Sequence, residues 1–200
     1  MLSLSHHPRP PLSEFVDCLW LVEGGQTPRL ERILPSGTIE VVINLRDDEV
    51  HIHDAAQPDR YKRFSGAVVS GTYSSVFICD AMQHEAMLGV HFKPGGAFPF
   101  LGALASELTN THADLADLWG QSALQLRERL CTQTTPQERF RIMEEVLNDR
   151  LRRSQSVVSK YKSPWTCLGR RVGAPKLEMS PKRLASASGS SSRCSKLRSD

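Results

Sequence analysis

Histidines are the residues of this sequence whose spacing points most directly to chemistry. His51 and His53 stand two positions apart, so on a β-strand both imidazoles would point to one face. A metal site of this kind also needs a carboxylate a few residues on and a later histidine, for which His84 and His91 are available. The expected glutamate after His53 is missing. We therefore predict no metal site and interpret the pair as exposed residues of a hairpin.

A second group of side chains occupies residues 89–101, GVHFKPGGAFPFL, between a strand-like and a helix-like region. A cation flanked by aromatic side chains could line a pocket for a small ligand. The two adjacent glycines could equally allow a tight turn, with the aromatic rings in the core. Both interpretations stay open, and we predict four ligand-binding residues: Phe92, Lys93, Phe98 and Phe100.

Basic residues near the C-terminus could contact DNA. The segments LGRRVG and MSPKRL resemble two helices joined by a turn, the second beginning at Ser180-Pro181 with cations in its first turn. The N-terminal residues of a recognition helix face base edges, and flanking cations neutralise phosphates. We predict base contacts for Lys182 and Arg183, and phosphate contacts for Arg170 and Arg171.

The charge is unevenly distributed along the chain. Residues 1–150 hold 13 Lys and Arg against 20 Asp and Glu, a formal charge of −7. Residues 151–200 hold 12 against 2, a formal charge of +10. This distribution fits a polyanionic partner for the basic end, and it fits a solvated, unstructured basic end equally well.

Patterns typical of enzymes are missing from the sequence. There is no nucleophile elbow, no P-loop and no dinucleotide-binding glycine motif. The five cysteines include no C-x-x-C pair. We predict no catalytic residue and no cofactor. No signal peptide and no membrane-spanning run is visible. We therefore expect a cytoplasmic protein with reduced thiols and no membrane partner.

Hydrophobic periodicity predicts an α+β order of elements. Residues 1–12 read as an irregular arm, and strands are expected at 38–45, 50–53, 66–69, 75–79 and 85–92. Helices are expected at 97–105, 111–119 and 122–130, and after Thr135, which precedes proline and glutamate as in a capping box. The last of these helices would bury one face, formed by Phe140, Met143, Val146, Leu147 and Leu151.

The order of these pieces resembles the AraC-type (AraC/XylS) transcription regulators that have a cupin-like N-terminal sensor domain. The resemblance runs from about residue 8 to 153. Its main motifs are FVDCLW (15–20), RILPSGTIEVVINL (32–45), the segment 89–101, ELTN (107–110) and LADLWG (115–120).

The resemblance implies a small antiparallel β-barrel or jelly-roll sensor at residues 8–96, then a helical block at 97–153. A partial helix-turn-helix at 154–184 and a disordered Ser-rich tail at 185–200 would follow. The family has two helix-turn-helix units, about 100 residues in all. Because a Ser-rich stretch follows Leu184 here, we expect a truncated or frame-disrupted DNA-binding region.

Two functions follow as expectations. The first is a ligand-responsive transcription regulator, with DNA and an unknown small-molecule effector as partners and a homodimer left open. The second is a cupin-like small-molecule-binding or metal-dependent enzyme domain without DNA binding. In that domain Lys93, His91 and the histidine pair at 51 and 53 would matter more. With an incomplete DNA-binding region, the regulator is expected to bind DNA weakly and with steep salt dependence.

Overall fold

The computed structural model describes residues 2–24, 30–80, 86–102 and 105–161, all within the first of two compact units, Met1–Ser163. Strands dominate up to Phe92, and helices dominate from Phe98 onward. The α+β class predicted from the sequence is therefore confirmed. Within the described residues, no helix combines the length and apolarity needed to cross a bilayer.

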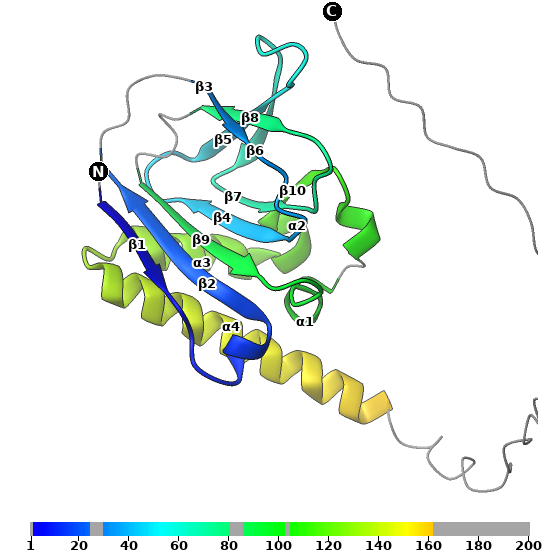
Figure 1. Ribbon diagram of the computed structural model, residues 1–200. Helices are drawn as coiled ribbons and strands as arrows, with labels where there is room; N and C mark the ends of the chain where they lie inside the picture. Colours follow the sequence, from blue (N-terminus) through cyan, green and yellow to red (C-terminus); the bar gives the residue numbers. More distant parts are fainter. Residues whose placement is uncertain (1, 25–29, 81–85, 103–104, 162–200) are drawn as a thin grey trace, which may run out of the picture. The chain divides into compact units, whose positions relative to one another are not determined.

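The strands form two antiparallel sheets that lie one above the other (Figure 1). The six-stranded sheet has the order β1 (Leu2–His6), β2 (Val16–Glu23), β9 (Ala86–Phe92), β4 (Glu40–Asn44), β7 (Ala67–Ser70), β10 (His112–Asp114). The four-stranded sheet has the order β3 (Leu30–Ile33), β8 (Phe77–Asp80), β5 (Glu49–His53), β6 (Tyr61–Ser65).

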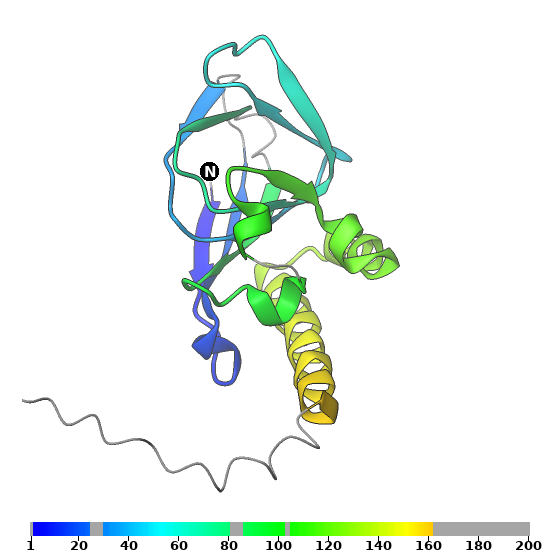
Figure 2. The same cartoon turned by 90° about the vertical axis from the view of Figure 1, so that its right-hand side faces the viewer.

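The helices cover the outer face of the six-stranded sheet, so this first unit is layered as sheet, sheet and helices (Figure 2). They are α1 (Phe98–Leu101), α2 (Leu115–Trp119), α3 (Gln121–Cys131) and α4 (Pro136–Tyr161). The start of α4 is as predicted, because the Thr135 hydroxyl accepts a hydrogen bond from the Glu138 amide at 3.4 Å.

Two hydrophobic cores lie on opposite faces of the six-stranded sheet. On β9, Leu88, Val90 and Phe92 join the large core beneath the helices, whereas Met87 joins a smaller core between the sheets. This division follows from the alternation of side chains along a strand. The α4 face predicted from periodicity packs on the large core, with Phe140, Met143, Leu147 and Leu151 buried.

Three regions differ from the sequence-based expectation. The N-terminal arm begins with strand β1, which pairs with β2 from Leu2 opposite Glu23 to His6 opposite Leu19. Residues 112–114, expected to be helical, form β10 and pair with β7. Gly102, with φ of 64°, ends α1 at Leu101, well short of residue 105. The six-stranded sheet thus extends to Asp114, beyond the predicted boundary at residue 96.

Candidate functional site: a cavity beside strand β10

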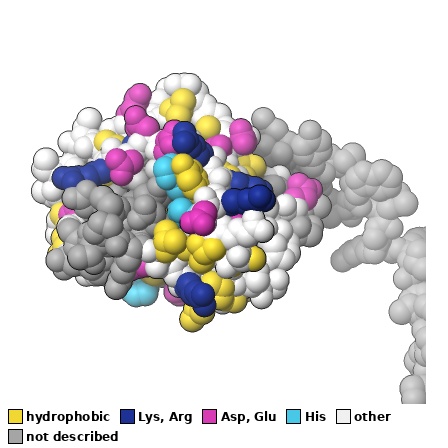
Figure 3. Space-filling model, turned by 90° about the horizontal axis from the view of Figure 1, so that it is seen from above, with side chains coloured by type: hydrophobic (Ala, Val, Ile, Leu, Met, Phe, Trp, Pro, Cys, Tyr) yellow, Lys and Arg dark blue, Asp and Glu magenta, His cyan; other side chains and the backbone are white. Residues whose placement is uncertain are grey.

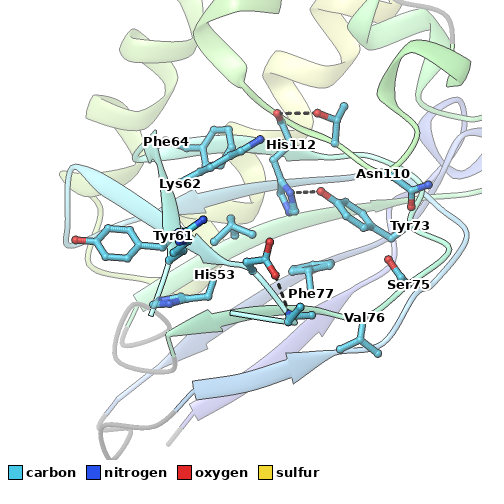
Figure 4. A pocket seen from close by; sticks show the side chains of 16 residues that line it. His53, Tyr61, Lys62, Phe64, Tyr73, Ser75, Val76, Phe77, Asn110 and His112 are labelled. Carbon is cyan, nitrogen blue, oxygen red and sulfur yellow. Dashed lines mark hydrogen bonds between the residues drawn. The ribbon is translucent and has the colours of Figure 1, made fainter. Parts of the chain in front are cut away.

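A large cavity beside β10 has a volume of about 560 Å³, within the range typical of small-molecule sites. Its walls come from three segments that are far apart in the sequence (Figure 4). The β5–β6 hairpin contributes residues 52–56, 60–62 and 64, the segment leading into β8 contributes 73 and 75–77, and the start of β10 contributes 110–112. The fold therefore builds this cavity from long-range pairing, with β10 as one of its walls.

Four half-buried rings form one side of the cavity. Phe77 meets His112 edge to face with ring centroids 4.8 Å apart, and Tyr73 lies 4.7 Å from Phe77 and 4.8 Å from His112. Phe64 extends the cluster from β6, with its centroid 5.7 Å from that of His112. A wall made of several contacting aromatic rings favours contact with a flat apolar group.

A hydrogen bond joins the Tyr73 hydroxyl to Nδ1 of His112 (Figure 4). Burial, and secondarily the nearby Lys62 ammonium, lowers the pKa of His112 to about 4. Burial raises the pKa of Tyr73 to about 12. Near neutral pH the phenol is therefore protonated and the imidazole neutral. The phenol is the stronger donor of the two, so it donates to Nδ1 and leaves the proton on Nε2 of His112.

Cations outnumber acids around the cavity. Arg60 and Lys62 line it, and neither forms an ion pair within the described part of the chain. The one acidic lining residue, Asp54, accepts hydrogen bonds from the amides of Ala56 at 2.7 Å and Gln57 at 3.1 Å. Seen from above, histidine side chains lie among hydrophobic, basic and acidic ones on this face (Figure 3). The electrostatic character of the cavity thus favours an anionic ligand.

A smaller cavity of about 120 Å³ continues between the two sheets and shares Ile52, Phe77 and His112 with the large one. The face of the six-stranded sheet that lines it carries a row of polar residues in register across five strands. That row runs in the order Cys18, His91, Glu40, Ser70 and His112. Polar side chains therefore lead from the large cavity into the interior between the sheets.

His91 and Glu40 are paired within this row. Nδ1 of His91 is hydrogen-bonded to the Glu40 carboxylate, which raises the pKa of His91 despite its partial burial. Its Nε2 lies 2.9 Å from Oγ1 of Thr38. Burial, together with the charges of Asp17 and Glu40, raises the pKa of the Cys18 thiol. Cys18 is therefore protonated near neutral pH, which is unfavourable for a nucleophile.

The four predicted ligand-binding residues divide into two pairs. Phe92 and Phe100 lie in the large core, with ring centroids 5.3 Å apart. Lys93 and Phe98 line a separate hollow of about 100 Å³, and Lys93 donates to the backbone oxygen of Ser13 at 2.7 Å. None of the four reaches the large cavity, so the structure does not bring them together as one site.

The histidine pair of β5 lies on one face, as expected, but each imidazole has a protein partner. His51 is 3.0 Å from Oε2 of Glu49, and Nδ1 of His53 donates to the Pro58 carbonyl at 2.7 Å. Both rings pack on Tyr61, at 4.7 and 5.2 Å between centroids. The described residues contain no group of three or more side chains suited to hold a metal ion, and His84 lies outside them.

The predicted DNA contacts Arg170, Arg171, Lys182 and Arg183 lie outside the described residues. Within the described part, sequence reasoning missed Tyr73, Phe77 and His112 as site residues. The stretch 111–114 alternates in polarity over too few positions to reveal a strand by itself. The density of aromatic residues at 73–77 is the one local signal that could have pointed to the cavity.

Fold and site together define an α+β protein whose two-sheet β domain carries a partly open cavity of ligand size. The chain belongs to the family described as "Domain of unknown function (DUF6597)", whose model matches residues 4–114. The match ends where β10 ends, so it covers both sheets and every wall of the large cavity. No curated protein and no solved structure matches the chain significantly.

Proposed function

We propose that this protein is a ligand-responsive, DNA-binding transcription regulator of the AraC type. In this proposal the β domain binds a small-molecule effector in the large cavity, and the basic C-terminal segment binds DNA. The main observation in support of the effector role is that β10 lines the cavity at its start and leads directly into the helical block at its end. His112 at its start lines the cavity, and α2 begins at Leu115, directly after its end.

Further contacts support a route from the cavity to the helices. The Asp114 carboxylate at the end of β10 accepts a hydrogen bond from the backbone amide of Ser65 on β6. Arg127 on α3 donates to the backbone oxygens of Asn44 at 2.9 Å and Asp47 at 2.8 Å, in the turn that joins β4 to β5. An effector that favours one arrangement of β6 and β10 would thereby bias the helices as well.

The DNA-binding role is assigned to Lys182 and Arg183 for bases and to Arg170 and Arg171 for phosphates. It rests on the basic charge of residues 151–200 and on the resemblance described above. The proposal carries with it the cytoplasmic location expected from the sequence. It assigns no catalytic residue and no cofactor, and it leaves the direction of regulation open.

A titration of the full chain against duplex DNA at two salt concentrations tests this proposal. We expect the affinity to fall steeply with salt, because binding releases counterions from the phosphates. Lys182→Gln together with Arg183→Gln should weaken binding and reduce the salt dependence. Arg63→Gln, a change of the same type on β6, is the matched control and should leave both unchanged. Equal DNA affinity for the wild type and the double variant would contradict the proposal.

The second candidate is a cupin-like binding or metal-dependent enzyme domain that does not act on DNA. The observation that favours it is the polar row across the six-stranded sheet, with His91 and Glu40 at its centre. Elemental analysis of the purified protein tests the metal-dependent form. A stoichiometric transition metal that is lost in His91→Gln would favour this candidate over the regulator.

A further inference from the structure

We propose that the large cavity binds a planar aromatic carboxylate. The ring of the ligand would lie against the Tyr73–Phe77–His112 wall, and its carboxylate would face Nε2 of His112 and the Lys62 ammonium. This inference rests on the proposed function in one respect: it takes the effector cavity of that proposal and names the chemical class of the effector.

The planar part of the ligand follows from the shape of the wall. Tyr73, Phe77 and His112 are each only half-buried although their rings contact one another, so ring surface remains open to the cavity. Val76 and Ile52 add apolar surface to the lining. A flat ring placed here would bury this aromatic surface in offset or edge-to-face contacts, each worth about 1 kcal/mol beyond area burial.

The carboxylate follows from the hydrogen-bonding groups that remain available. Nδ1 of His112 is occupied by the Tyr73 hydroxyl, so Nε2 is left as a donor. Arg60 and Lys62 add two cations without an ion-pair partner among the described residues. The acidic group of the lining, Asp54, already accepts two backbone amides. The cavity therefore offers donors and positive charge, which a carboxylate satisfies with charge-assisted hydrogen bonds.

The volume limits the size of the ligand. A cavity of about 560 Å³ suits a compound of one or two rings, which would fill the space between the hairpin and β10. A larger cofactor would have to extend into solvent. A long flexible acid would gain less from a rigid aromatic wall, because ordering each of its rotatable bonds costs entropy.

Calorimetric titration of the full chain with 2-naphthoate tests the inference, with 2-naphthamide and decahydro-2-naphthoate as comparison compounds. The amide keeps the rings and removes the charge, whereas the saturated acid keeps the charge and removes the planarity. We expect 2-naphthoate to bind at least about tenfold more tightly than the amide, which lacks the charge-assisted hydrogen bond. It should also bind at least about tenfold more tightly than the saturated acid, which lacks the aromatic contacts of about 1 kcal/mol each. Equal binding of the three compounds, or no binding of 2-naphthoate, would overturn it.

Two variants complete the test. Lys62→Gln should raise the dissociation constant for 2-naphthoate about tenfold or more, and Lys62 is exposed, so the fold should tolerate the change. Arg63→Gln removes the same charge from the adjacent position, which does not line the cavity, and should leave binding unchanged. An equal loss of affinity in both variants would mean that only the overall charge of the protein matters. That result would overturn the assignment of Lys62 as a ligand-binding residue of the cavity. The calorimetric titration contains no DNA, so its result is independent of the DNA titration. If 2-naphthoate binds but DNA does not, only the assignment as a DNA-binding regulator is rejected. If DNA binds but 2-naphthoate does not, only the proposed ligand class is rejected.

Discussion

Arg127 on α3 lies so close to Gly66 that a Cβ atom at position 66 would stand 2.5 Å from its Nε. In this position the guanidinium donates to the backbone oxygens of Asn44 and Asp47 and to the side chain of Asp48. One side chain thus fixes the turn between β4 and β5 to the helical layer, and the absence of a side chain at Gly66 makes room for it.

The first prediction concerns this contact. Arg127→Ala should lower the free energy of unfolding by about 1–3 kcal/mol, since two backbone carbonyls lose a charged donor. Arg127→Lys should recover little of the lost stability, because a lysine ammonium cannot reproduce the planar arrangement of N–H donors of the guanidinium. Asp48→Asn should change stability by less than about 1 kcal/mol, because the Asp48 side chain is 89% exposed. Urea unfolding measures all three, and a lysine variant as stable as the wild type would contradict the interpretation.

The second prediction concerns Gly89 and Trp20, which are opposite each other on β9 and β2. A Cβ atom at position 89 would stand 2.1 Å from Cε2 of the Trp20 indole. Gly89→Ala should therefore destabilise the fold by about 1–3 kcal/mol, the usual cost of overpacking. In the background of Trp20→Leu the same change should cost clearly less, and strict additivity of the two substitutions in denaturation experiments would refute the contact.

The third prediction is a pH dependence that arises from His112. Its pKa is about 4 in the folded protein against an ordinary value of 6.5, so between these values the unfolded chain binds the additional proton. Stability should therefore fall as pH drops from 6.5 towards 4, by at most about 3 kcal/mol, an upper limit because His112 keeps some contact with solvent. His112→Asn should flatten this part of the curve.

His91 provides an internal control with the opposite sign. Its pKa is raised by the Glu40 carboxylate, so its contribution to stability is present below pH 6.5 and is lost as pH rises through the folded-state value. His91→Gln should thus lower stability by a constant amount below pH 6.5, remove the fall in stability above it, and leave the acidic slope unchanged. Chemical unfolding across this range of pH checks both residues, and an unchanged acidic slope in His112→Asn would contradict the assignment to His112.

The fourth prediction concerns the contact between α2 and α4. The Arg150 guanidinium lies 3.7 Å from the centre of the Trp119 ring, and the indole N–H donates to the Phe100 backbone oxygen at 2.9 Å. Trp119→Phe should cost about 1–3 kcal/mol, because it leaves that buried carbonyl without its donor. Arg150→Ala should cost about 1 kcal/mol. Thermal unfolding measures both, and a phenylalanine variant as stable as the wild type would argue against a structural role for the indole N–H.

Local signals in the sequence were sufficient for some elements. Thr135, Pro136 and Glu138 placed the start of α4 correctly because a helix cap depends on neighbouring residues. The β-branched run at 38–45 likewise predicted β4, whose residues pair with strands on both sides. In both cases the information lies within a few residues of the element it specifies.

The candidate site could not be predicted in this way, because its walls are brought together by long-range pairing. His112 reaches the cavity only through β10, which pairs with β7 across more than 40 residues, and periodicity assigned its segment to a helix. The unusual composition of the segment 89–101 led to the prediction of ligand-binding residues there, yet Phe92 and Phe100 lie in the core. Composition identified aromatic residues but could not tell which face of the sheet they occupy.

The alternation along β9 divides two tasks within one strand. Leu88 and Val90 hold the helices to the sheet, whereas Met87 and His91 face the space between the sheets. Neighbouring positions of one strand therefore serve different layers of the domain. A substitution at His91 would change the lining of the space between the sheets, whereas one at Leu88 or Val90 would loosen the helices from the sheet.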